Sequence, residues 1–170
     1  MTLGAIAQAI QDTPFFTAFR ESALPYPIIL STHLTCIALF GGLILMSDLR
    51  LLGLVLKNVP VSEVLLRTRP WKRVGFVIMV SCGIMLGGAK LFNYYDNPYF
   101  DVKMTLLLLV GVHAIVFHRS VYADPQKLDG LESMPAMAKA AGVISMALWV
   151  GILSMGRWIA YFERPPWYPH

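Results

Sequence analysis

The sequence predicts an all-α fold: an integral membrane four-helix bundle with an N-terminal amphipathic interfacial helix. Its composition points into a bilayer, because 56% of the 170 residues are hydrophobic and only 14% are charged. A soluble domain of this length carries roughly 25% charged residues. In addition, four apolar segments each approach the ~20 residues needed to cross a hydrocarbon core. We therefore expect residues 1–170 to form a single transmembrane domain.

The predicted spans cover residues 25–47, 71–90, 102–121 and 137–158. Pro25 and Pro27 suit the first turn of the first span, where a proline removes no helical hydrogen bond. Ahead of it, the apolar residues of segment 3–20 fall roughly on one helical face, but the segment is too polar to span. It predicts an interfacial helix that is broken near Asp12-Thr13-Pro14.

Lysine and arginine predict the orientation of the bundle. The connections after the first and third spans carry Arg50, Lys57, Arg67, Arg69, Lys72, Arg73, Arg119, Lys127 and Lys139. The opposite side carries Arg20, Lys90, Lys103, Arg157 and Arg164. The positive-inside rule then places both termini on the periplasmic side of a bacterial inner membrane. Because these basic residues bracket apolar runs, the net charge of +4 indicates a lipid bilayer as partner and no nucleic acid.

Two histidines inside predicted spans are the first candidates for a functional site. Intramembrane ionisable residues are rare and costly, and they mark functional sites by default. With a rise of 1.5 Å per residue, His33 lies roughly 12 Å and His113 roughly 16 Å below the outer ends of two spans that run in the same direction. Imidazoles at similar depth on facing helices can ligate the iron of a haem b, with Lys90 and Arg157 near its propionates. The plainer alternative is a histidine hydrogen-bonded within the bundle.

A third histidine, His118, lies near the predicted inner interface. It follows His113 by five residues, so the two rings should point about 140° apart and not share one small site. Asp48 occupies the same layer, and a structural contact of Asp48 with His118 or Arg119 is one expectation. The alternatives are a quinone-binding or proton-relay site on the cytoplasmic side, or His118 as the second axial ligand of the haem.

The chain resembles a family of bacterial four-helix inner-membrane proteins without an assigned activity. The residues that carry the resemblance are His33-Leu34, Ser47-Asp48-Leu49-Arg50-Leu51-Leu52-Gly53, Phe117-His118-Arg119 and Gly156-Arg157-Trp158-Ile159-Ala160-Tyr161. They include His33 and His118 more clearly than His113. More loosely, the chain is similar to cytochrome b subunits that anchor extracytoplasmic dehydrogenases. That similarity implies electron transfer through a b-type haem to quinone, with histidines of separate helices as ligands.

These observations lead to one principal functional expectation and two alternatives. The chain is expected to be an electron-transfer subunit that binds one haem b through His33 and either His113 or His118. It would pass electrons between a periplasmic dehydrogenase or cytochrome c and the quinone pool, within a homo-oligomer or larger complex. No nucleophile–base arrangement points to independent catalysis. The alternatives are a cofactor-free structural or assembly subunit and a transporter of copper or a small molecule.

Overall fold

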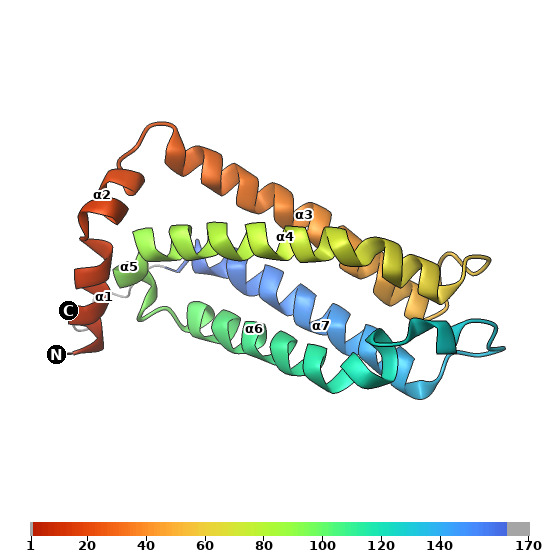
Figure 1. Ribbon diagram of the computed structural model, residues 1–170. Helices are drawn as coiled ribbons and strands as arrows, with labels where there is room; N and C mark the ends of the chain where they lie inside the picture. Colours follow the sequence, from red (N-terminus) through yellow and green to blue (C-terminus); the bar gives the residue numbers. More distant parts are fainter. Residues whose placement is uncertain (1, 163–170) are drawn as a thin grey trace.

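The computed structural model describes residues 2–162 and confirms the all-α class. Four helices in this range are long and apolar enough to cross a membrane, so the chain is a multi-pass membrane protein. They are α3 (Pro25–Leu51), α4 (Val61–Ala89), α6 (Pro98–Phe117) and α7 (Ala136–Ile159). Figure 1 shows them running alongside one another, with two short helices across one end. Arg164, used in the orientation argument, lies outside the described residues.

Five shorter elements complete the described chain: α1 (Leu3–Gln11), α2 (Pro14–Arg20), α5 (Leu91–Tyr94), the π-helix η1 (His118–Tyr122) and the 3-10 helix η2 (Pro125–Leu128). The end of the bundle with α1, α2 and α5 is called the N-terminal end below. The opposite end, with the connections 52–60 and 118–135, is called the loop end (Figure 1).

The N-terminal segment breaks where its sequence predicts. Helix α1 ends at Gln11 and α2 begins at Pro14, whose missing N–H is harmless in a first helical turn. Arg20 joins α2 to the end of α4 by donating from Nη1 to the Ala89 carbonyl at 3.2 Å. Large apolar side chains such as Leu3, which is 80% exposed, remain uncovered on this segment, as expected of helices at a membrane surface.

Helix α4 begins ten residues before the predicted span. Its added turns are amphipathic, and their buried positions repeat with helical spacing: Val61, Val64, Leu65 and Thr68. Its first turn is capped from elsewhere in the chain, because Oδ1 of Asp129 accepts from the Ser62 backbone N–H at 2.9 Å. Helix α6 likewise begins earlier than expected, at Pro98, after the side chain of Asn97 caps it through the Tyr99 N–H.

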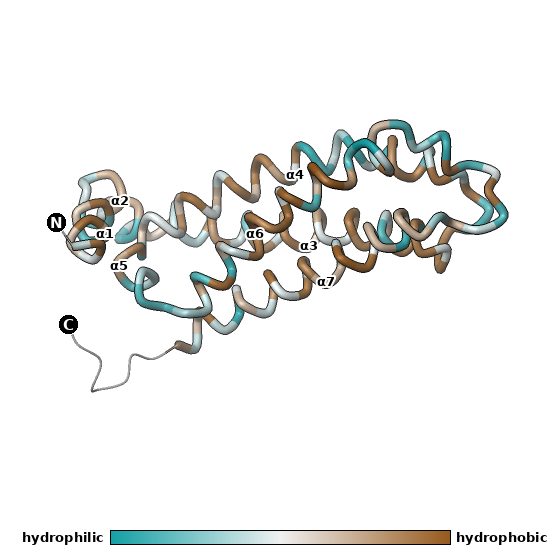
Figure 2. Tube along the Cα trace, turned by 90° about the horizontal axis from the view of Figure 1, so that it is seen from below, coloured by the Kyte–Doolittle hydropathy of each residue, from teal (hydrophilic) through white to brown (hydrophobic). Residues whose placement is uncertain are grey.

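The main apolar core lies at the loop end, where the connections 52–60 and 118–135 meet the long helices. It comprises Leu51, Val61, Leu65, Phe117, Val121, Leu128, Ala138 and Ala141. Elsewhere many large apolar side chains are exposed on the surface of the bundle, which is the surface that lipid would cover. Figure 2 shows the hydrophobic colour along the long helices and hydrophilic stretches on α4 toward the loop end.

The four long helices pack in the order α4, α3, α7, α6. Helix α3 packs against α4 on one side and α7 on the other, and α7 also packs against α6. Helices α4 and α6 do not pack against each other along their lengths. Small residues allow the close contacts. For example, a side-chain carbon at Gly75 would stand 3.3 Å from Cβ of Phe40. The bundle is therefore closely packed through α3 and α7 and loose between α4 and α6.

Candidate functional site: a charged cavity among the four long helices

A cavity of about 370 Å³ lies among all four long helices, toward the loop end. Its size is within the range of small-molecule sites in proteins, about 300–1,000 Å³. Helix α3 contributes Phe40, Ile44, Ser47 and Asp48, and α4 contributes Leu65, Arg69, Lys72, Arg73 and Phe76. Val110, His113 and Ala114 of α6, His118 and Tyr122 of η1, and Ser145 of α7 complete the lining. Titratable groups of both signs thus meet an apolar and aromatic wall.

Asp48 is the most unusual residue of the lining. Only 3% of it is exposed, and its Oδ2 atom has no hydrogen-bond partner among the described residues. Ser145 of α7 lines the cavity beside the same carboxyl group. No lysine, arginine or histidine of the described chain forms an ion pair with Asp48, so the expected contacts with His118 and Arg119 are not formed. A buried carboxylate oxygen without a donor is costly, and such groups are rare unless they serve a function.

Three cations of α4 line the same cavity as Asp48, but none of them forms an ion pair with it. Lys72 donates from Nζ to the Ser47 hydroxyl at 3.0 Å, next to Asp48 along α3. Arg69 donates from Nη2 to the Tyr122 carbonyl and so ties α4 to η1. Arg73 makes no hydrogen bond or ion pair with any residue of the described chain, although it lines the cavity. The cavity therefore holds a free acceptor at Asp48 and a free donor at Arg73.

His113 and His118 line this one cavity, against the expectation that their rings diverge too far to share a site. The reason is local backbone geometry. Phe117, the last residue of α6, has φ −89° and ψ −1°, and a π-helix begins at His118. The rotation of 100° per residue of a regular α-helix therefore does not continue from Phe117 into His118. His113 is held in place by a 3.0 Å hydrogen bond between Nε2 and the Ala141 carbonyl of α7.

His33 lies elsewhere, at the interface of α3 and α4. Its Nδ1 is 3.0 Å from the Met79 carbonyl, and its Cε1 stands 3.3 Å from where a side chain at Gly83 would begin. It precedes Asp48 by fifteen residues on one continuous helix, which separates the two by roughly 22 Å along the axis. Because His113 and His118 share the cavity with Asp48, His33 is far from both.

This placement does not fit one haem held between the first and third spans. Axial ligands face each other across a single iron. The structure places His33 beside Met79 and His113 in the cavity with Asp48, so the two histidines do not lie at the similar depth that the sequence predicts. His118 is farther still toward the loop end. The proposed propionate partners also have other contacts, since Lys90 lies over the Tyr26 ring and Arg157 bonds the Tyr161 hydroxyl.

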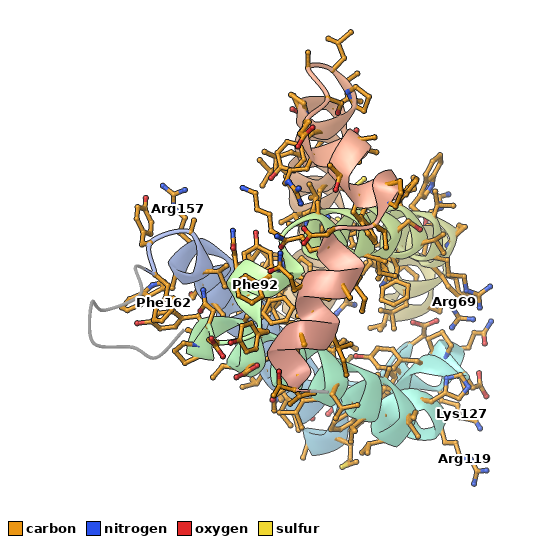
Figure 3. All side chains as sticks on the ribbon, turned by 90° about the vertical axis from the view of Figure 1, so that its left-hand side faces the viewer. Arg69, Phe92, Arg119, Lys127, Arg157 and Phe162 are labelled. Atoms are coloured by element: carbon orange, nitrogen blue, oxygen red, sulfur yellow. The ribbon has the colours of Figure 1, made fainter. Side chains whose placement is uncertain are left out.

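Figure 3, viewed from the N-terminal end, adds the lateral arrangement of the charges. Arg69, Lys127 and Arg119 lie on one side of the bundle, and Arg157 and Phe162 lie on the other. Within residues 2–162, no cluster of three or more histidine, cysteine, aspartate or glutamate side chains has an arrangement that would hold a metal ion.

Sequence reasoning missed the part of the site contributed by α4 and α7. Lys72 and Arg73 count as loop cations when the second span begins near residue 71, but α4 starts at Val61 and carries both into the bundle. Ser145 has no distinguishing signal, because serines are common in membrane helices. The usable signal was Asp48, an acidic residue at the end of an apolar run.

No curated protein and no solved structure matches the chain. One family matches residues 26–162, which include every residue that lines the cavity. The match leaves out α1 and α2, which lie before residue 26. The chain belongs to this family, DUF6644, a family of unknown function.

Proposed function

We propose that the protein is a membrane subunit that binds a quinone in the cavity around Asp48 and exchanges protons with it. The observation that carries this proposal is the pairing of an unsatisfied buried acceptor with an unpaired donor in an intramembrane cavity. A quinol head group has hydroxyl donors for Oδ2 of Asp48, and a quinone has carbonyl acceptors for Arg73 or Lys72. The redox step itself needs two electrons from a partner redox protein, together with two protons.

The walls of the cavity support a flat, apolar head group. Phe40 and Phe76 lie on opposing helices with their ring centroids 6.3 Å apart. Ile44, Leu65 and Val110 add aliphatic surface. A ligand that is aromatic in shape, polar at its two ends and soluble in lipid matches this combination better than a fully hydrated ion does.

The orientation of the chain in the membrane decides which side supplies protons to the cavity. The positive-inside rule supports an inner-membrane protein with the loop end in the cytoplasm. The cavity is near that end, so we expect its protons to exchange with the cytoplasm through the layer of Asp48, His113 and His118. The proposal keeps the quinone-binding or proton-relay site that the sequence suggests as an alternative, and it includes no haem.

Tryptophan fluorescence tests the proposal on the purified full chain in nanodiscs. Trp149 packs edge-to-face on Phe40 with centroids 5.4 Å apart, so a quinone in the cavity should quench it. Titration with a benzoquinone carrying a single isoprene unit should give saturable quenching that Trp149→Phe largely removes. Asp48→Asn should weaken binding about tenfold, equivalent to ~1.4 kcal/mol.

Asp101→Asn is the matched control, because Asp101 is an exposed aspartate of α6 that does not line the cavity. It should bind the quinone like the unmodified chain. Quenching that rises linearly without saturation, or that is equally strong in Asp48→Asn, would refute the proposed site.

A further inference from the structure

The cavity opens sideways between α4 and α6. Helices α4 and α6 both line the cavity, but they do not pack against each other along their lengths. On α4 the lining residues Arg73 and Phe76 are exposed, and on the α6 side Ala114 and His118 are exposed. The lining residues of α3 and α7 are buried or half-buried. The exposed part of the lining thus faces out between α4 and α6.

The surface beside this opening is one that lipid would cover. Val77 follows Phe76 on α4 and is 61% exposed, and Ile115 follows Ala114 on α6 and is 77% exposed. Both positions belong to candidate membrane spans. A molecule that enters between them passes directly from hydrocarbon to the charged interior, without crossing the aqueous loop end.

We propose that the ligand is a long-tailed isoprenoid quinone whose tail leaves the cavity between α4 and α6 into the lipid. This inference rests on the proposed function, because it supplies the tail to a head group already placed at Asp48. An isoprenoid chain is too apolar to remain beside Arg69, Lys72 and Arg73, and α3 and α7 block the other directions by close packing. The opening between α4 and α6 is polar at Arg73 and His118 and apolar at Phe76 and Ala114. The tail should therefore leave on the side of Phe76 and Ala114, one turn of each helix farther from the loop end.

Photoaffinity labelling tests the route directly on the full chain in nanodiscs. The probe is a benzoquinone with a photoreactive diazirine in a long isoprenoid tail, and labelled peptides are mapped by mass spectrometry. We expect labels on α4 and α6 near Val77 and Ile115, and we expect excess short-tailed quinone to suppress them. The groove on α3 lined by Ile28, Ser31 and Cys36, among others, should stay unlabelled.

A matched pair of variants sharpens the test. Ala114→Trp places bulk in the opening and should lower competable labelling about tenfold. Val116→Trp adds the same bulk at a position that is 57% exposed, does not line the cavity and points about 160° away from Ala114 around α6. It should leave labelling unchanged, which also shows that a tryptophan at this depth does not unfold α6.

The possible failures can be told apart. Labels that the short-tailed quinone does not suppress would mean that no head-group site exists, and the proposed function would fall with the route. Suppressible labels on the outer face of α3 or α7, or undiminished labelling in Ala114→Trp, would overturn the route while leaving the head-group site in place.

Discussion

Gly142 of α7 lies directly against the backbone of Asp48 on α3. A side-chain carbon at Gly142 would stand 3.0 Å from the Asp48 carbonyl oxygen, a backbone atom that cannot swing aside. Because Ala141, the preceding residue, accepts the hydrogen bond from His113, this one contact sets the spacing of three helices around the cavity.

Gly142→Ala should therefore destabilise the bundle by about 1–3 kcal/mol, because α3 and α7 must separate to admit the methyl group. It should also weaken quinone binding. Gly87→Ala on α4 is the control, since nothing lies within 4 Å of a side-chain carbon there. That variant should be neutral or stabilising by up to ~1 kcal/mol. Thermal unfolding in detergent measures both, and equal melting temperatures would contradict the packing argument.

Asp48→Asn should stabilise the protein while it weakens ligand binding. The unsatisfied carboxylate oxygen is a cost to the folded state, and removal of its charge should recover about 1–3 kcal/mol. Functional residues often oppose stability in this way. The measurement is thermal unfolding of Asp48→Asn beside Asp101→Asn. If Asp48→Asn melted below the unmodified chain, Asp48 would be a structural residue and not a ligand-binding one.

His33→Ala should reduce stability without changing quinone binding. The variant removes the hydrogen bond to the Met79 carbonyl between α3 and α4, a loss of about 1 kcal/mol. Its distance from Asp48, roughly 22 Å along α3, leaves the cavity intact. His113→Ala is the comparison, because that side chain lines the cavity and should change the fluorescence titration. A weaker quinone affinity in His33→Ala would show that the two regions are coupled.

A reduced-minus-oxidised visible spectrum tests the expectation of a haem b. Because His33 and His113 lie at different depths, we expect no α-band of a bis-histidine haem b from chain purified out of haem-replete cells. An α-band that disappears in both His33→Ala and His113→Ala would demand a different helix arrangement from the one described here.

Asp129 should make stability depend on pH in the acidic range. Hydrogen bonds from Ser62 at the start of α4 hold the pKa of Asp129 below its ordinary value of 3.8. A carboxyl with a lowered folded pKa contributes stability above its unfolded value and loses it as the pH falls through the folded value. The melting temperature should thus fall below about pH 4, and less steeply in Asp129→Asn. Parallel curves for the two proteins would contradict the cap.

Much of the fold follows from periodicity and composition. The proline at position 14 and the preceding Asp12-Thr13 were enough to locate the break between α1 and α2. The span boundaries were less accurate, because hydropathy detects only the apolar part of a helix. The first turns of α4 are stabilised by contacts of Val61 and Leu65 with the loop-end core, which involve residues distant in sequence.

The candidate site shows the same division. The sequence predicts Asp48 and His118 in one layer near the inner ends of their spans, because the residue number fixes how far along its helix each side chain lies. The other residues that line the cavity with them were not predicted. The expected angle of about 140° between His113 and His118 did not keep them apart, because a π-helix begins at His118.

By itself, the sequence determined that this chain is a multi-pass, all-helical membrane protein with ionisable residues in its spans, since the bilayer requires long apolar helices with satisfied backbone groups. Only the tertiary structure decided which of those residues meet. The depth of each side chain depends on where its helix begins, and the neighbours of each helix depend on close contacts such as that of Gly142 with Asp48. Those contacts place His113 and His118 beside Asp48 and leave His33 against Met79.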